Sequence, residues 1–150
     1  MEKLPPLLIV EDSDEDFEVM CWALQKIGFT HPILRAERAE TALLHLFPKQ
    51  PVATIPKPLP CLVLMDLNMP GMNGLEFLEE VSQRQPKLAI PIVVMSTSTN
   101  PLDISACYGF GAAGYIIKPF KLEEYMETIR ALTLYWFNTV KLPEKNYDEQ

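Results

Sequence analysis

Short apolar segments alternate with helical patterns along most of the chain. Five segments bounded by turn residues predict buried β-strands, at residues 7–10, 32–36, 61–65, 91–95 and 114–117. Apolar residues at helical spacing follow each strand and predict helices from the Ser13 or Asp14 cap to Gly28, at 37–47, from about 75 to Pro86, at about 101–110 and at about 122–139. This alternation predicts an α/β fold: one doubly wound domain with a five-stranded parallel sheet.

The bulk composition fits a globular protein and excludes several classes of function. The chain has 150 residues, of which 48% are hydrophobic and 22% are charged, and its net charge is −7. It offers no basic stripe for DNA or RNA, so direct nucleic-acid binding is not expected. No stretch reaches the roughly 20 apolar residues of a membrane span, and the first residues lack the layout of a signal peptide. Because the three cysteines have no metal-binding spacing, we expect a cytoplasmic protein with reduced thiols.

Polar side chains stand directly after, or at the end of, four of the predicted strands. Glu11 and Asp12 follow the first strand, Asp66 follows the third, Ser96 the fourth and Lys118 the fifth. Open α/β sheets bind ligands at the carboxyl ends of their strands, so we expect these side chains to converge there. Three crowded carboxylates repel one another, and a hard cation such as Mg²⁺ relieves that repulsion. The sequence therefore predicts a magnesium site and phosphate chemistry.

Each of these residues also has an ordinary structural interpretation. Asp66 could serve a turn, but the Pro-Gly pair that follows it already provides one. Glu11 and Asp12 could cap the first helix, but the serine and aspartate after them can do so. Lys118 could be a surface lysine, although it stands between a buried strand and a proline. Their joint placement at successive strand ends favours the functional interpretation.

Four stretches of the sequence resemble the receiver domain of two-component response regulators, a CheY-like family. They are Ile9-Val10-Glu11-Asp12, Met65-Asp66-Leu67-Asn68-Met69-Pro70-Gly71-Met72-Asn73-Gly74, Val94-Met95-Ser96 and Gly114-Tyr115-Ile116-Ile117-Lys118-Pro119-Phe120. The resemblance runs from residue 7 to about 131 and implies the flavodoxin-like (βα)5 fold of that family, with strand order 2-1-3-4-5. It also implies that the chain is not a classical enzyme. Its only chemistry would be Mg²⁺-dependent self-phosphorylation and autodephosphorylation.

The resemblance assigns roles to the strand-end residues. It implies that Asp66 is the phosphorylated nucleophile, and that Mg²⁺ is bound by Glu11, Asp12, Asp66 and the backbone carbonyl of Asn68. The Lys118 ammonium would help to neutralise the phosphoryl oxygens, as phosphoryl transfer requires. Glu11 stands where many relatives have aspartate, which changes the metal geometry slightly without removing a ligand.

An output switch is also implied by the resemblance. Once Asp66 is phosphorylated, the Ser96 hydroxyl would hydrogen-bond a phosphoryl oxygen and pull the loop after the fourth strand inward. Tyr115 on the fifth strand would follow into the vacated space. We therefore expect phosphorylation to change the amide chemical shifts around Ser96 and Tyr115.

Three other functions fit parts of the pattern. A phosphatase or phosphotransferase of the haloacid dehalogenase type also uses a strand-end aspartate and Mg²⁺. Its nucleophile lies on the first strand, however, with a second aspartate two residues later, where this chain has Asn68. Flavin binding would need a loop that cradles phosphate, whereas the acids at 11–16 would repel one. A receiver-like scaffold that is never phosphorylated generally lacks an acid or the lysine, and this chain keeps all of them.

The end of the chain predicts how the signal is passed on. About twenty residues follow the receiver pattern, too few for a DNA-binding module, so we expect a stand-alone regulator with no effector domain and an unknown downstream protein. Apolar residues on nearly every face extend the last helix, at Leu134, Tyr135, Trp136 and Phe137. Three consecutive aromatics cannot all point inward, which favours an interface. A longer core helix packed on its own domain is the alternative.

Two further features of the sequence resemble one subfamily of response regulators. The proline-rich connection at 48–60 and the ending at 136–143 resemble the small response regulators that are paired with cyanobacterial phytochrome-type histidine kinases. That subfamily implies a phytochrome sensor kinase as the phosphoryl donor, and a homodimer formed through the last helix. The proline-rich connection itself favours a stiff surface insertion without chemistry.

Overall fold

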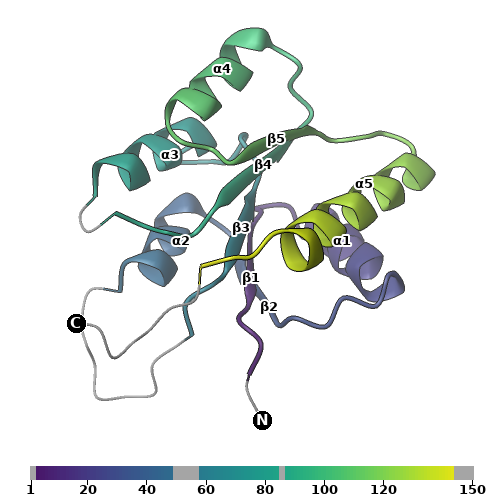
Figure 1. Cartoon of the computed structure of the whole chain (residues 1–150). Helices are drawn as coiled ribbons and strands as arrows, with labels where there is room; N and C mark the ends of the chain where they lie inside the picture. Colours follow the sequence, from purple (N-terminus) through teal and green to yellow (C-terminus); the bar gives the residue numbers. More distant parts are fainter. Residues whose placement is uncertain (1–2, 49–57, 85–86, 144–150) are drawn as a thin grey trace.

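The computed structural model describes residues 3–48, 58–84 and 87–143, which form a parallel sheet between two layers of helices (Figure 1). The strands are β1 (Leu7–Val10), β2 (Ile33–Ala36), β3 (Leu62–Met65), β4 (Ile92–Ser96) and β5 (Gly114–Ile117). They lie in the order β2-β1-β3-β4-β5, and every pairing is parallel. The predicted doubly wound sheet and its strand order are therefore confirmed.

The helices divide between the two faces of the sheet. One face is covered by α1 (Asp14–Lys26) and α5 (Leu122–Leu134), and the other by α2 (Ala39–Leu46), α3 (Gly74–Gln83) and α4 (Pro101–Gly109) (Figure 1). Two apolar clusters fill the layers, one on each face. Because the central strands β1, β3 and β4 are buried on both faces, they read as continuous apolar runs in the sequence.

Local signals fix where the helices begin and end. Ser13, rather than Asp14, is the N-cap of α1, and its hydroxyl accepts a hydrogen bond from the first turn. Gly28 follows that helix with a φ of 79°, a left-handed conformation that glycine adopts without strain. Asn73 and Glu76 form a reciprocal capping box at the start of α3. This cap anchors the loop that leads away from β3.

The last helix differs from the prediction. A single helix was expected to reach residue 139, but α5 ends at Leu134 and a π-helical turn, η1 (Tyr135–Thr139), follows it. Its wider spacing shows in the Val140 N–H, which donates to the Tyr135 carbonyl at 2.9 Å. The Thr139 hydroxyl likewise donates to the Leu134 carbonyl at 3.1 Å.

The three aromatic side chains of the π-helical turn differ in how far they are buried. Trp136 and Phe137 pack against the cluster between α1, α5 and the sheet. Tyr135 stays about half exposed, at 51%.

Some features predicted from the sequence lie outside the residues that the structure describes. They are the middle of the proline-rich connection, residues 49–57, and Pro86, which was predicted to end α3. That helix ends earlier, at Gln83. Among the helices described, none combines the length and the apolar composition needed to cross a membrane.

Candidate functional site

The register of the sheet places the ends of β1 and β3 side by side. Val10 pairs with Met65 across these two strands, so Glu11 and Asp66 leave the sheet together. The backbone N–H of Asp66 donates to the Val10 carbonyl at 3.3 Å, which extends the ladder by one residue. Both acids therefore stand on rigid strand ends.

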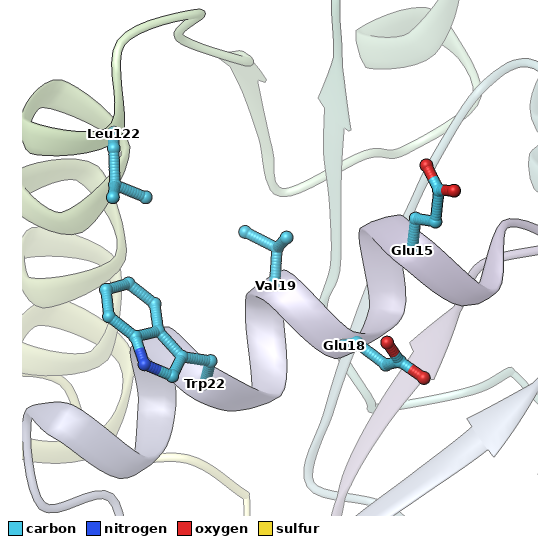
Figure 2. Close-up of a pocket in the computed structure, with 5 residues that line it drawn as sticks. All are labelled: Glu15, Glu18, Val19, Trp22 and Leu122. Atoms are coloured by element: carbon cyan, nitrogen blue, oxygen red, sulfur yellow. The ribbon is translucent and has the colours of Figure 1, made fainter.

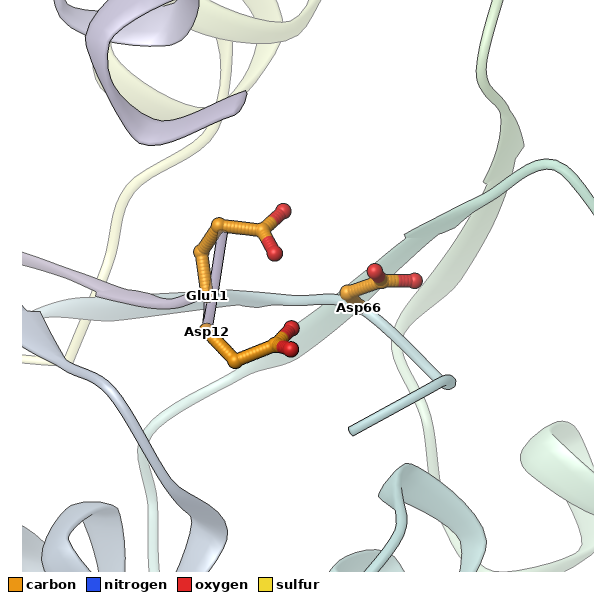
Figure 3. A group of neighbouring side chains, drawn as sticks. All are labelled: Glu11, Asp12 and Asp66. Carbon is orange, nitrogen blue, oxygen red and sulfur yellow. The ribbon is translucent and has the colours of Figure 1, made fainter. Parts of the chain in front are cut away.

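The carboxylates of Glu11, Asp12 and Asp66 form one group at this edge (Figure 3). One oxygen from each lies within 4.8 Å of the other two. Glu11 is buried, Asp66 is half-buried and Asp12 is exposed, so the group opens to solvent on one side. Three convergent hard oxygen donors with an open side suit a divalent cation that keeps several of its waters, as Mg²⁺ does.

Burial makes two of these acids, Glu11 and Asp66, hold protons more tightly than free carboxylates do. Burial raises the pKa of Glu11 to about 7; the N–H of Ser13 and the Lys118 ammonium oppose the shift, and the Asp66 charge adds to it. Burial also raises the pKa of Asp66, and Lys118 opposes that shift. A bound cation would favour the ionised form of both groups.

Lys118 approaches the acids from the end of β5. Its Nζ lies 3.7 Å from Oε1 of Glu11 and 3.8 Å from Oδ2 of Asp16, and its side chain is only 16% exposed. Its backbone N–H donates to the Ser96 carbonyl at 2.7 Å, which holds the chain after β5 against the end of β4. The structure thus brings a half-buried cation to the acid group.

Ser96 and Tyr115 are linked through the loop between β4 and α4. The Ser96 hydroxyl is fully buried and accepts the Ser98 N–H at 3.1 Å. The Tyr115 hydroxyl donates to the Ser98 carbonyl at 2.8 Å. The Ser98 hydroxyl in turn donates to Asp103 on α4 at 2.7 Å. One short loop therefore joins the end of β4, the middle of β5 and the first turn of α4.

Asn68 lies in the exposed loop after β3. Its backbone N–H donates to Oδ1 of Asp66 at 3.4 Å. Glu40 on α2 steadies the same loop, because its Oε1 accepts the Met72 N–H at 3.0 Å. Gly71, with a φ of 75°, makes the turn beside that carboxylate.

A family comparison agrees with this geometry. Residues 7–130 match the family model of the response regulator receiver domain. The chain belongs to this receiver family. Its CheY-like fold, its strand order and its strand-end acids are therefore features of one recognised kind of domain.

Two individual relatives match most of the length of this chain. Response regulator Rcp1 of Synechocystis is 31% identical over 144 residues, which cover 95% of this chain and 97% of Rcp1. The probable methanogenesis regulatory protein FilR2 of Methanothrix harundinacea is 30% identical over 137 residues, covering 91% of this chain and 86% of FilR2. This receiver is thus related to regulators from more than one signalling context.

Solved structures give the same relationship. The phosphorylated cyanobacterial phytochrome response regulator RcpA has a TM-score of 0.82 at 28% identity, over 94% of this chain and 99% of RcpA. The Mn²⁺-bound form of Rcp1 has a TM-score of 0.80 at 29% identity, over 93% of this chain and 99% of Rcp1. A relative of this receiver therefore holds a divalent cation, and the acid group fits one here.

The four residues predicted to form an interface divide into two pairs. Leu134 and Tyr135 are 56% and 51% exposed. Trp136 and Phe137 are half-buried, and the Phe137 ring packs edge-on to Phe29 with centroids 4.9 Å apart. The prediction of an interface thus rests on Leu134 and Tyr135. Trp136 and Phe137 instead fit the alternative prediction, a helix end that packs on its own domain.

A shallow groove lies between α1 and the start of α5 (Figure 2). Its volume is about 460 Å³, and it is lined by Glu15, Glu18, Val19, Trp22 and Leu122. None of the three grouped carboxylates lines it. The acids accordingly lie outside this groove, at the open edge of the sheet.

Two residues of the site's surroundings escaped the sequence analysis. Arg35 at the end of β2 contacts the loop that carries Glu11, and Glu40 contacts the loop that carries Asn68. The one available signal was a charged residue inside the short apolar strand 33–36. A cation there is unexpected unless acidic groups from a neighbouring strand end lie close to it.

Proposed function

We propose that this receiver accepts a phosphoryl group on Asp66 from a sensor histidine kinase and passes the signal on through contacts with other proteins. The convergence of Glu11, Asp12 and Asp66 beside Lys118 is the observation that carries this proposal. Acids crowded at an open edge next to a half-buried ammonium form a site for a cation and a phosphoryl group together.

The transfer would proceed by attack on phosphorus. An Asp66 carboxylate oxygen attacks the phosphorus of a phosphohistidine, a new P–O bond forms, and the P–N bond breaks with its electron pair going to the imidazole. Hydrolysis reverses the modification: water attacks the phosphorus, the P–O bond to Asp66 breaks, and inorganic phosphate leaves. Asp66 is regenerated as a carboxylate in each cycle, so the residue is a carrier of the phosphoryl group.

The surrounding residues would supply position and charge. Glu11, Asp12 and the Asn68 carbonyl, with Asp66 itself, would hold Mg²⁺, which neutralises charge on the phosphoryl oxygens when bound. Lys118 would pair with a further phosphoryl oxygen, exchanging its contact with Glu11 for one with the phosphate. Ser96 would donate its hydroxyl hydrogen to a third oxygen, while its oxygen can go on accepting the Ser98 N–H.

The likeness to RcpA and Rcp1 supports a phytochrome-type histidine kinase as the donor for this receiver. The exposed Leu134 and Tyr135 support self-association through the end of α5, because exposed apolar patches mark association sites. Phosphorylation would then alter the β4–α4 loop and, with it, contacts to a downstream protein.

The test is incubation with acetyl phosphate, with and without Mg²⁺, read by intact protein mass. We expect wild type to gain one phosphoryl group only when Mg²⁺ is present, and Asp66→Asn to gain none. Glu79→Gln on the exposed surface of α3 is the matched acid-to-amide control and should be phosphorylated as wild type is.

Two results would contradict the proposal. One is a phosphoryl gain by Asp66→Asn equal to that of wild type. The other is no gain by wild type together with no stable beryllofluoride complex, since such a complex would form even if the acyl phosphate were hydrolysed quickly. That second result would favour a receiver-like scaffold.

A further inference from the structure

Arg35 places a guanidinium against the loop that carries the acids. It stands at the third position of β2, paired with Ile9 of β1. Its Nε donates to the Glu11 carbonyl at 3.2 Å, and its Nη1 lies 2.7 Å from Oδ1 of Asp14. One planar group therefore joins both ends of the turn between β1 and α1.

Aromatic packing fixes the plane of this guanidinium. Its central carbon lies 4.7 Å from the centre of the Phe17 ring, in the first turns of α1. The side chain of Arg35 is only 19% exposed. A second acid, Glu37, lies 3.6 Å from Nη1 and completes the charge balance. An arginine that lies over an aromatic ring, bonds two partners through its guanidinium and is largely buried has few other orientations available.

Helix stability does not explain this placement. The start of α1 is the positive end of the helix dipole, where a cation is unfavourable. In addition, Nη2 of Arg35 is buried and has no hydrogen-bond partner among the described residues. An unpaired buried donor is energetically unfavourable, because it has given up its hydrogen bonds to water. Such local costs are expected where a side chain serves a site rather than the fold.

Arg35 and Lys118 bracket Glu11 from two sides. Arg35 holds its main-chain carbonyl, while the Lys118 ammonium lies 3.7 Å from its carboxylate. The residue next in sequence is Asp12, so a shift of the Glu11 carbonyl would move both metal-facing acids. The position of this carbonyl therefore affects where Glu11 and Asp12 lie relative to Asp66.

We propose that Arg35 is a positioning residue: its fork fixes the β1–α1 turn in the arrangement that converges Glu11, Asp12 and Asp66 on a divalent cation. The metal part of this inference rests on the proposed function. Outer groups of this kind typically change metal affinity by about 10- to 100-fold when they are mutated. Loss of the positive charge alone would raise the Mg²⁺ affinity, because it makes the site more negative.

Two substitutions separate geometry from charge. Arg35→Lys keeps the charge but cannot reach the Glu11 carbonyl and Asp14 together, and Arg35→Gln removes the charge. Arg84 is the matched control, because it pairs with Glu80 at 3.0 Å and stacks on Phe47 at 5.1 Å, away from the acids. Mg²⁺ affinity is measured by calorimetry, and amide exchange of residues 12–17 is measured in the metal-free chain.

If Arg35 positions the turn, both Arg35 variants bind Mg²⁺ about tenfold or more weakly than wild type. Their backbone amides at residues 12–17 also exchange faster. Arg84→Lys and Arg84→Gln match wild type in both measurements. Wild-type affinity and exchange in Arg35→Lys, or tighter Mg²⁺ binding by Arg35→Gln, would overturn the inference. If wild type binds no Mg²⁺, the proposed metal site fails. The exchange data then still decide whether Arg35 holds the turn.

Discussion

Glu11 is the buried acid of the metal group, and its protonation links pH to the cation. In the metal-free fold its pKa is raised from 4.5 to about 7, chiefly by burial. The folded chain therefore binds this proton more tightly than the unfolded chain. Its stabilising contribution is complete below the unfolded pKa and is lost as pH rises through about 7. A cation that binds the ionised form must displace the proton below that pH.

The pH dependence of Mg²⁺ binding follows from this shift. We expect affinity to increase from about pH 6 to about pH 8, with proton release at the lower end of that range. Calorimetry in buffers of different ionisation enthalpy measures both quantities. In Glu11→Gln the affinity should be lower and the proton release smaller. If Glu11→Gln released as many protons as wild type, another group would have to carry the titration.

Gly74 shows how closely the site loop packs on the sheet. A Cβ at this position would lie 2.6 Å from Cε of Met65 and 2.8 Å from Cα of Leu67. The methionine end can move, but the Leu67 backbone cannot do so without disturbing the loop after Asp66.

We expect Gly74→Ala to lower the free energy of unfolding by about 1–3 kcal/mol through overpacking. Gly109→Ala is the control: it lies at the end of α4 with nothing within 4 Å of its added Cβ, and should be neutral or stabilising by up to about 1 kcal/mol. Urea unfolding measures both. Equal midpoints for the two variants would contradict the packing argument.

At the scale of elements, the loop between β4 and α4 is the part of the site with a built-in connection to β5. The Tyr115 hydroxyl donates to the Ser98 carbonyl, which ties the loop to β5. The predicted switch involves the two strands that this contact connects. Phosphorylation would have to change that contact for the signal to reach β5.

Removal of this hydroxyl should loosen the loop in the unphosphorylated chain. A single hydrogen bond contributes about 1 kcal/mol net, so we expect Tyr115→Phe to speed amide exchange of Ser98 and Asn100 roughly fivefold. Tyr108→Phe is the control, since its hydroxyl accepts the Tyr115 N–H and does not touch this loop carbonyl. Exchange of Ser98 and Asn100 at the wild-type rate in Tyr115→Phe would show that the contact does not restrain the loop.

The strands were predictable because buried parallel strands read as short apolar runs. Of the five, β1 and β5 match their predicted bounds, β2 and β3 begin one residue later than predicted, and β4 is shifted by one residue at both ends. The π-helical turn after Leu134 was not predictable, because it depends on how Trp136 and Phe137 fit against their own domain. No local pattern encodes that fit.

At the scale of the whole molecule, the proposed surface for self-association is the end of α5. Leu134 and Tyr135 are its exposed apolar residues, since Trp136 and Phe137 pack inward. We expect a dimer in sedimentation at micromolar concentration, weakened by Leu134→Glu because a charge would be buried in the contact. Leu102→Glu on α4, where the leucine is 77% exposed, should leave the dimer unchanged. A monomeric wild type, with and without a phosphoryl donor, would contradict this proposal.

The candidate site shows which part of a molecule its sequence can predict. Strand-end acids are readable because parallel topology carries every carboxyl end to one edge. Glu11, Asp12 and Asp66 were predicted to converge in this way, and the structure brings them together. The contacts of Arg35 and Glu40 with the site loops were not predicted. Arg35 on β2 contacts the loop after β1, and Glu40 on α2 contacts the loop after β3, so both contacts join residues that are distant in sequence.

The most direct test of the account is to locate the acyl phosphate itself. After incubation with Mg²⁺ and acetyl phosphate, borohydride reduces a phosphorylated aspartate to homoserine, and peptide mass mapping finds the changed residue. We expect homoserine at position 66 and unchanged side chains at Glu11 and Asp12. Reduction at Glu11 or Asp12 with Asp66 intact would contradict the assignment of Asp66 as the phosphorylated residue.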